Sequence, residues 1–453
     1  MSLLADPITP IGAARPDAVV AGLRELDGRT VAWFELSGRT ATSSGAAEAE
    51  VVERALSIAG TVGCPVVGVV RSVAVEVAPT GLDGLVAWGR VAAAATRLSG
   101  VVPILVAVTG PVHGSLAPIL GLADHVVMTA DATAYVNGPA PVERITGAQV
   151  TPGELGGSAV HSSTSGLVSL TATDADDAVA ALSELLDHLP DNHLAEAPRR
   201  PTGDAPTRPC HAAASVVPAE PHRSYDIRDV VADVIDHGSL LEVHPDHAPN
   251  VVTAYARLGG TSVAIVANQP GVRAGTLDIP ASVKAARHVQ LADAFGIPIL
   301  TFVDTPGYQP GRELERRGMI RHGAKLVHAY AAATVPRLCV IVRKAYGGAY
   351  IVMDSRTMGS DLVLAWPRAE IAVMGAAGAV GILHRGEDDP AIRAKLEEQY
   401  RDAFCTPRIA AERGLVDDVV DPADTRRVLA AALPRLRHKR PELPARKHDN
   451  QPL

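Results

Sequence analysis

At 453 residues, the chain is long enough for two or three domains. Its formal net charge of −8 and pI of about 6.1 disfavour nucleic acid or an anionic membrane as the main partner. Hydrophobic residues make up 47% of the chain but aromatic residues only 3%, so we expect large cores built from Val, Leu, Ile and Ala.

The four cysteines are widely separated and form no CxxC pair. This favours reduced thiols over a zinc site or a disulfide framework, and we expect no metal in this chain. The sequence has no run of 18 apolar residues, and residues 1–16 lack a basic region followed by an apolar run. We therefore expect a cytoplasmic protein without a membrane span.

In the first half, strand patterns alternate with helix patterns, which predicts α/β units. Two of the strands are β-branched runs opened by a proline. The expected elements are a strand over 29–34, helices over 45–59 and 85–98, strands after Pro65 and Pro103, and a helix over 178–189.

Residues 190–222 are rich in proline and show no periodicity, which predicts a linker. The expected organisation is therefore an N-terminal domain over 1–190, a linker over 191–224 and a C-terminal domain over 225–453.

The second half repeats the same order of elements. It is expected to contain a helix over 230–235, a hairpin of 254–258 and 263–266, helices over 281–295 and 321–334, and strands after Pro298 and Pro336.

The repeat has a fixed spacing of 233 residues between equivalent positions. The pairs are Pro65 and Pro298, Pro103 and Pro336, and Gly114 and Gly347. Further on, Gly138 and Gly375 are 375 − 138 = 237 apart, so the second copy carries about four extra residues. One α/β unit is thus predicted to occur twice.

In each copy, a glycine turn follows the second proline-led strand. The second copy contains Gly347-Gly348 and the first contains His113-Gly114-Ser115. A strand, a glycine turn and a helix start aim free N–H groups at one point, where they can stabilise an oxyanion. A single Gly-Gly would more often be only a tight turn, but its repetition favours a functional role.

Several motifs of the second half carry a dense resemblance to a known family. They are Asp304 to Gly311 (DTPGYQPG), Ile320 to Leu326 (IRHGAKL), Arg343 to Met353 (RKAYGGAYIVM) and Ala365 to Ala376. The chain resembles the carboxyltransferase β subunit of actinobacterial biotin-dependent acetyl-/propionyl-CoA carboxylases, especially the short type linked to fatty-acid biosynthesis. The resemblance implies an α/β fold of two crotonase-like (β-β-α superhelix) domains related by internal duplication.

The implied reaction moves CO2 from carboxybiotin to the α-carbon of an acyl-CoA. Two oxyanions form, one on biotin and one on the thioester, and backbone donors suffice to stabilise both. By resemblance, the backbone of Gly348 and Ala349 serves the biotin oxyanion, and the backbone of Gly114 and Ser115 serves the thioester. The two sites are implied to come from different subunits across a dimer interface.

Three further residues of the second turn are implied to bind substrate: Gly347, Tyr350 and Ile351. In related sequences the position of Ile351 holds Asp in propionyl-selective types and Ile in those accepting acetyl-CoA. The resemblance therefore favours acetyl-CoA with propionyl-CoA tolerated. His161 and His322 are expected to be structural or surface residues and not bases.

The sequence has no Met-Lys-Met biotin-attachment motif. The resemblance therefore implies a separate biotinylated α subunit that supplies biotin carboxylase and the biotin carrier. It also implies a homo-oligomer, as a hexamer, or a mixed ring with another β subunit.

The first half departs from the family at two places. Val73-Ala74-Val75-Glu76 stands where relatives have Gly-Gly-Ala-Arg, and His113-Gly114-Ser115 where they have Ala-Gly-Gly. Bulky residues in a loop that borders a ligand would obstruct it. Two alternatives therefore stay open: a non-catalytic or half-site assembly subunit, and a biotin-dependent acyl-CoA decarboxylase subunit.

Overall fold

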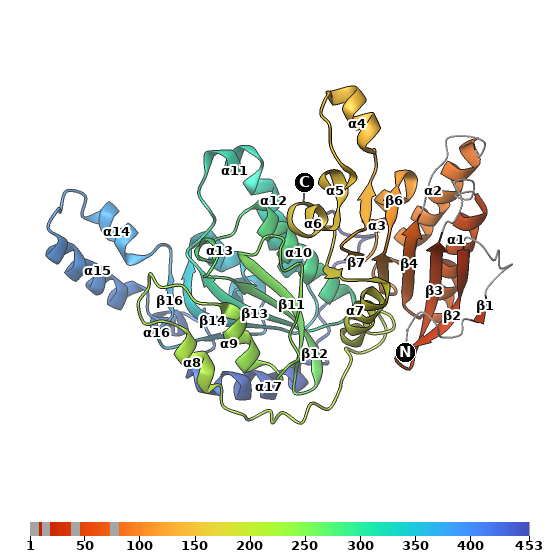
Figure 1. The fold of residues 1–453 in the computed structure, drawn as a ribbon. Helices are drawn as coiled ribbons and strands as arrows, with labels where there is room; N and C mark the ends of the chain where they lie inside the picture. Colours follow the sequence, from red (N-terminus) through yellow and green to blue (C-terminus); the bar gives the residue numbers. More distant parts are fainter. Residues whose placement is uncertain (1–8, 11–18, 38–45, 73–80, 453) are drawn as a thin grey trace. The chain divides into compact units, whose positions relative to one another are not determined.

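The computed structural model describes residues 9–10, 19–37, 46–72 and 81–452 (Figure 1). The chain forms two compact units. Unit 1 comprises Met1–Pro198 with His244–His247 and Ala294–Gly296, and unit 2 comprises Arg199–Val243, Ala248–Asp293 and Ile297–Leu453. The division into functional domains at residues 190 and 225 stays a prediction.

The interval predicted to be a linker, 191–224, contains packed structure. It holds the short helix α8 (His211–Val216). Cys210 and Ala213 are fully buried in the core of unit 2. Proline content alone was therefore a poor guide to exposure in this interval.

Unit 1 is built on a sheet in the order β1-β2-β3-β4-β5-β7-β9. Strands β1 to β3 are antiparallel, and the pairs from β3 to β9 are parallel. The bounds are β1 Thr9–Pro10, β2 Val19–Leu26, β3 Arg29–Ser37, β4 Val66–Ser72, β5 Ile104–Val108, β7 His125–Thr129 and β9 Leu170–Ala172.

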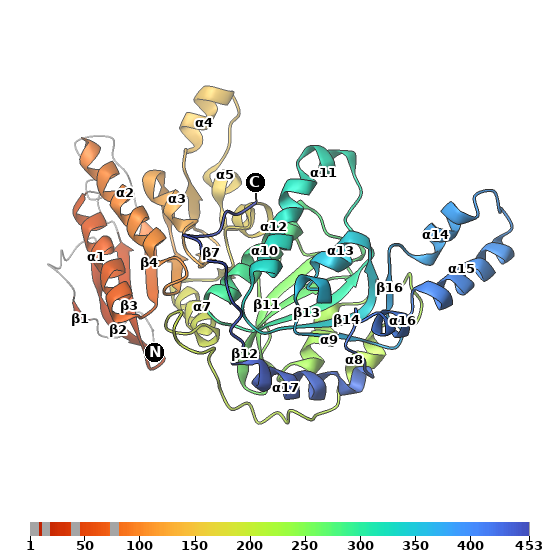
Figure 2. The ribbon, with the colours of Figure 1, turned by 180° about the vertical axis from the view of Figure 1, so that it is seen from behind.

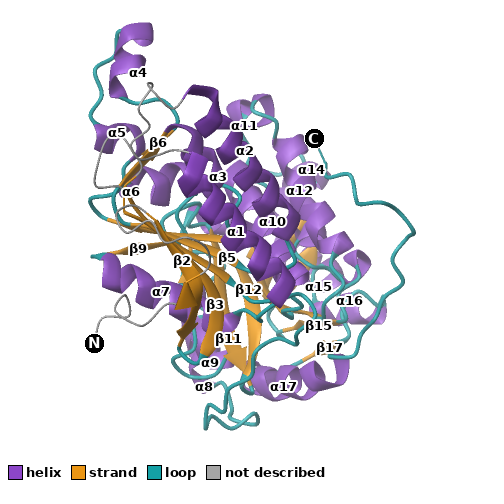
Figure 3. Ribbon diagram, turned by 90° about the vertical axis from the view of Figure 1, so that its right-hand side faces the viewer, coloured by secondary structure: helices purple, strands orange, loops and turns teal. Residues whose placement is uncertain are grey.

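Helices cover both faces of this sheet (Figure 3). On one face, α1 (Ala46–Val62), α2 (Gly81–Leu98) and α3 (Ala117–Leu120) share an apolar core with β3, β4 and β5. On the other, α7 (Ala175–His188) packs against β5, β7 and β9. Shorter helices, α4 (Pro139–Thr146), α5 (Pro152–Gly156) and α6 (Ser158–Val160), lie between β7 and β9 in the chain.

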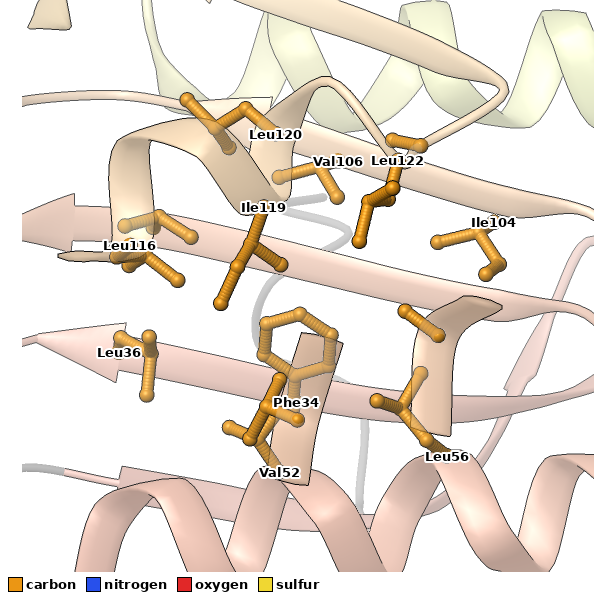
Figure 4. Close-up of a pocket in the computed structure, with 14 residues that line it drawn as sticks. Phe34, Leu36, Val52, Leu56, Ile104, Val106, Leu116, Ile119, Leu120 and Leu122 are labelled. Carbon is orange, nitrogen blue, oxygen red and sulfur yellow. The ribbon is translucent and has the colours of Figure 1, made fainter. Parts of the chain in front are cut away.

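The core of unit 1 contains a cavity of about 30 Å³ around Phe34 (Figure 4). The residues around it are all apolar, among them Val52, Leu56 and Ile119. A space of this size without polar partners holds neither a substrate nor an ordered water. We therefore interpret it as a packing void and not as a ligand site.

Unit 2 has a sheet in the order β10-β11-β12-β13-β14-β15-β17, with β16 paired to β14 beyond this path. The hairpin β11–β12 turns through Gly259 and Gly260 at φ +57° and +80°, as a two-residue hairpin loop requires. The bounds are β10 Leu241–Val243, β11 Val251–Leu258, β12 Thr261–Asn268, β13 Ile299–Thr305, β14 Arg337–Tyr346, β15 Leu362–Ala365, β16 Glu370–Ala372 and β17 Asp418–Val419.

The central strands of unit 2 are buried on both faces, which explains their continuous apolar runs. Helices α9 (Ile227–Val234) and α17 (Thr425–Leu436) share a core with one face. Helices α10 (Ile279–Ala294) and α12 (Met319–Ala332) lie on the other (Figure 2). From α12, the Tyr330 hydroxyl bonds Thr301 of β13 at 2.9 Å.

All the predicted helices and strands are present, with ends shifted by a few residues.

A pair of helices, α14 (Ala376–Leu383) and α15 (Pro390–Phe404), projects from the sheet of unit 2 (Figure 1). Within the described residues, no helix is long and apolar enough to cross a membrane.

We expect Gly110→Ala to destabilise unit 1 strongly. Gly110 is buried, and a Cβ there would lie 1.7 Å from the backbone oxygen of Arg71. Because a backbone atom must move, the expected loss in free energy of unfolding is about 1–3 kcal/mol or more, measured by chemical denaturation.

The matched control is Gly89→Ala on an exposed face of α2, where a Cβ meets no atom within 4 Å. It should stabilise the helix by about 0.5–1 kcal/mol. Equal stability of the two variants would contradict the close approach at Gly110.

Candidate active site

The second turn connects β14 to α13 (Gly347–Val352). Tyr346 is extended, at φ −112° and ψ 140°, and Gly347 then reverses the chain at φ +59°. A Cβ on Gly347 would also lie 3.2 Å from the backbone oxygen of Val373. Conformation and space therefore both require glycine at position 347.

Gly348 and Ala349 lie in the first turn of α13, where helix N–H groups lack an acceptor within the helix. Gly348 is exposed, whereas Ala349 is buried. A Cβ on Gly348 would lie 3.6 Å from the Tyr308 ring, an ordinary contact. Gly348 thus keeps its backbone open beside an aromatic wall, and the helix dipole favours negative charge there.

Tyr308 was not among the predicted site residues, although the motif Asp304 to Gly311 contains it. It lies in the loop after β13, and the Gly307 and Gln309 backbones bond Leu277 at 3.1 and 2.8 Å. Burial raises the pKa of the Tyr308 phenol, so the ring stays neutral.

Tyr350 and Ile351 continue the same helix. The Ile351 side chain is 46% exposed. The Tyr350 hydroxyl is buried and bonds no atom of the described residues, and burial raises its pKa to about 12. Within this turn Gly348 lies beside Tyr308 and Ile351 is partly exposed, and the roles of Gly347 to Ile351 in binding and catalysis stay predictions.

The first turn, in unit 1, has the same backbone course. His113 ends β6 (Pro111–His113) at φ −130° and ψ 158°, and Gly114 follows at φ +70°. Ser115 then lies within the 3-10 turn η2 (Gly114–Leu116), which leads into α3. The half-buried Ser115 thus has a helix-start N–H, as Gly348 does.

Beside the first turn, His113 stacks on Tyr135 of β8 (Thr133–Tyr135), with ring centroids 4.2 Å apart and planes 11° apart. Burial lowers the pKa of His113 and keeps its imidazole neutral. The loop Val73 to Glu76, which was expected to border the thioester, lies outside the described residues.

His161 and His322, which are not expected to act as bases, have different surroundings. His161 uses both ring nitrogens, bonding the Ala134 oxygen and the Ser165 hydroxyl at 2.8 Å each. His322 on α12 is partly buried, and burial with nearby cations lowers its pKa. Across the parts of the chain that the structure describes, no group of three or more His, Cys, Asp or Glu is arranged to hold a metal ion.

The fold and the paired strand–glycine–helix turns define a crotonase-like α/β protein. The carboxyl transferase domain family matches residues 8–451. The chain belongs to this family, and it is an enzyme, a carboxyltransferase.

Three relatives place it within the family. The propionyl-CoA carboxylase carboxyltransferase subunit of Haloferax mediterranei is 45% identical over 444 residues, covering 96% of this chain and 86% of the relative. The methylmalonyl-CoA decarboxylase subunit alpha of Veillonella parvula is 40% identical over 439 residues, covering 96% and 86%. The crystal structure of the transcarboxylase 12S hexamer with hydrolysed methylmalonyl-CoA matches with a TM-score of 0.93 and 41% identity, covering 100% of this chain and 89% of that one.

We expect Gly348→Val to reduce carboxyl transfer by about 100- to 1,000-fold, as for loss of an oxyanion donor. A β-branched side chain on this exposed residue would cover the N–H groups of the second turn. Because a Cβ there has room, the free energy of unfolding should stay near that of the unsubstituted protein.

Gly347→Ala provides the contrast. Its positive φ should lower the free energy of unfolding by about 1–2 kcal/mol. Transfer is measured by initial rates and stability by denaturation. Normal turnover in Gly348→Val would remove the second turn from the mechanism.

Proposed function

We propose that this chain is the carboxyltransferase component of a biotin-dependent acyl-CoA carboxylase. It would transfer CO2 from carboxybiotin to the α-carbon of a short acyl-CoA, acetyl-CoA with propionyl-CoA tolerated. The observation that carries the proposal is the pair of turns, in which Gly114 and Gly347 both adopt a positive φ, +70° and +59°, at the start of a helical turn. The reaction requires two sets of oxyanion donors, and the chain has two such turns.

In this mechanism the protein's contribution is positional and electrostatic. Carboxybiotin, when bound, supplies CO2 and the base that removes the α-proton. The N–H groups of Gly348 and Ala349 donate to the biotin carbonyl oxygen as negative charge develops there. The N–H groups of Gly114 and Ser115 donate to the thioester oxygen. Each donor of this kind typically lowers the barrier by about 2.7–4 kcal/mol.

The surroundings of the second turn fit a flat, weakly polar ring such as that of biotin. The Tyr308 ring lies beside Gly348, and Ile351 adds apolar surface on the same helix. The Tyr350 hydroxyl adds a neutral polar group within the wall. The roles of Gly347, Tyr350 and Ile351 in substrate binding are part of this proposal.

We further propose that units 1 and 2 descend from one duplicated unit. In each, an antiparallel hairpin leads into parallel strands, as β2–β3 and as β11–β12. Each also has a small parallel pair beside the turn. His113 pairs with Tyr135 in one and Tyr346 with Ala372 in the other, at offsets of 346 − 113 = 233 and 372 − 135 = 237. These are the two offsets found in the sequence.

The proposed assembly is a ring of dimers, as in the short actinobacterial β subunits, with the two sites completed by different subunits. The projecting α14 and α15 support it, because α15 has no buried residue and the pair exposes Ile382, Leu383 and Phe404 at 59%, 64% and 54%. A second copy of this chain would cover that surface. The transcarboxylase 12S relative is described as a hexamer. A cytoplasmic location, expected from the sequence pattern, and a role in fatty-acid biosynthesis, implied by the resemblance, belong to the proposal.

Reconstitution tests the function. With a biotinylated α subunit, ATP and labelled bicarbonate, we expect fixation of label into acetyl-CoA and less into propionyl-CoA. Omission of the α subunit should abolish fixation, because the sequence has no biotin-attachment motif. Carboxylation by the purified chain alone would refute the proposed partner.

The same assay components distinguish two other candidate functions from carboxylation. The relative named as a methylmalonyl-CoA decarboxylase subunit favours decarboxylation as a second candidate, which would proceed with a biotinylated carrier and malonyl-type thioesters without ATP. A half-site subunit would bind acetyl-CoA poorly in a calorimetric titration and recover activity only with a second β subunit. Binding at the low-micromolar level would argue against the half-site.

Ile351→Asp should shift the preference from acetyl-CoA toward propionyl-CoA. A single pocket residue typically discriminates by about 1–3 kcal/mol, which is read from the ratio of the two kcat/KM values. Ile392→Asp is the matched control, since Ile392 is also 46% exposed but lies on α15. An unchanged ratio in Ile351→Asp would show that Ile351 does not contact the acyl group.

A further inference from the structure

The strand that carries the second turn is irregular halfway along its length. β13 and β14 pair in register from Ile299↔Arg337 to Val303↔Ile341, and then Thr305 pairs with Ala345. Two steps along β13 thus correspond to 345 − 341 = 4 steps along β14. The extra residues form a bulge opposite Asp304.

At this bulge β14 also changes its other neighbour. Before it, Leu338 to Ile341 pair with β15, and after it, Lys344 to Tyr346 pair with β16. The bulge therefore marks the place where β14 leaves the main sheet and runs toward Gly347. The bulge ends at Ala345, two residues before Gly347.

The carboxylate of Asp304 occupies the bulge. One oxygen accepts the Lys344 backbone N–H at 3.1 Å, and the other accepts Arg343 Nε at 2.9 Å and the Tyr225 hydroxyl at 2.8 Å. Asp304 is 1% exposed. Arg343 is held in turn by the Arg223 oxygen at 2.8 Å and by the Tyr225 ring, whose centroid is 5.0 Å away.

Asp304 also lies close in the chain to the loop that carries Tyr308, whose ring lies beside Gly348 in the candidate site. Its own N–H donates to the Asn268 side-chain oxygen at 3.3 Å, and the Tyr308 loop begins after Thr305, the last residue of β13. One residue thus lies between the loop that carries Tyr308 and the strand that leads to Gly347. Since the Tyr308 ring would lie 3.6 Å from a Cβ on Gly348, the separation of these two segments sets the space beside the proposed donors.

We propose that Asp304 is a positioning residue for carboxyl transfer. Its carboxylate holds the β14 bulge and thereby sets the second turn against the Tyr308 loop. This inference rests on the proposed function, in which the second turn supplies oxyanion donors. It assigns a role to a charged group that contacts none of the five predicted residues of that turn.

A comparison with unit 1 supports the assignment. The residues equivalent to Asp304 and Arg343, 233 positions earlier, are Arg71 and Gly110. There the backbones come into close contact at Gly110, and the strand is interrupted between β5 and β6. At this crossing unit 1 has Arg71, which pairs with Glu35 at 2.9 Å, whereas unit 2 has the buried Asp304 carboxylate, which accepts a backbone N–H of the neighbouring strand.

The test compares Asp304→Asn with Asp236→Asn. Asp236 is fully buried, accepts the Gly259 and Gly260 N–H groups at 3.0 and 2.7 Å, and pairs with Arg426 at 2.6 Å. It resembles Asp304 in chemistry but lies at the opposite end of the sheet, beside the β11–β12 hairpin. Both variants remove a buried charge, so a merely structural role would affect them alike.

For Asp304→Asn we expect kcat to fall about 10- to 100-fold, the effect of a small misplacement of reacting groups. The calorimetric affinity for acetyl-CoA should change less than kcat, because the proposed thioester donors lie in unit 1 and only the proposed acyl contact of Ile351 lies on the second turn. Amide hydrogen exchange should accelerate over 344–352. Asp236→Asn should leave both kcat and this exchange near their original values.

The inference is overturned if Asp304→Asn retains the kcat of Asp236→Asn, or if exchange over 344–352 does not change. Hydrogen exchange requires no substrate and therefore decides the positioning role separately. If the unsubstituted protein shows no carboxyl transfer with its α subunit, the proposed function fails, while accelerated exchange in Asp304→Asn would still establish the positioning of the second turn.

Discussion

Both units must solve one geometric problem: a central strand has to leave the main sheet and still satisfy its backbone groups before it reaches the turn. Buried N–H and C=O groups that lose a ladder partner need another one. In unit 1, Gly110 allows two backbone segments to approach closely, and the Thr109 N–H still donates to the Val70 oxygen at 2.8 Å. In unit 2 a side chain takes the place of a backbone partner, because the Asp304 carboxylate accepts the Lys344 N–H at the bulge.

Unit 2 holds a second buried ion pair on the same strand. At the start of β14, Arg337 pairs with Asp354 at 3.0 Å, and both side chains are almost fully buried. Asp354 lies two residues after α13 at φ +56°, so this pair ties the end of α13 to the first residue of β14. Burial raises the pKa of Asp354 to about 7 despite the nearby guanidinium. The strand before the turn and the helix after it are therefore held by two buried ion pairs, which favour one arrangement of the turn over others.

The features that the sequence predicted well are those set by local chemistry. Proline-led β-branched runs identified the parallel strands β4, β5, β13 and β14, and the repeated spacing identified the two turns. β2 was missed because its alternation is interrupted by Gly22 and by the buried Arg24, which stacks on Trp33 at 4.3 Å. The role of Asp304 could not be predicted, because it depends on a bulge formed by residues 40 positions away. From the sequence alone Gly347 and Gly348 are two equivalent glycines of one turn, whereas in the structure only Gly347 has a conformation that requires glycine.

This difference between neighbouring glycines bears on how the first turn is interpreted. A site built from backbone N–H groups is insensitive to most side chains, because every residue except proline has the donor. What it requires is a positive φ at the residue that reverses the chain, and Gly114 supplies it at +70°. Replacement of the family's second glycine by Ser115 leaves the N–H in place and changes only the space beside it. The departure of the first turn from the family pattern therefore changes the side chain beside the turn, and the positive φ that the proposed donor site requires is kept.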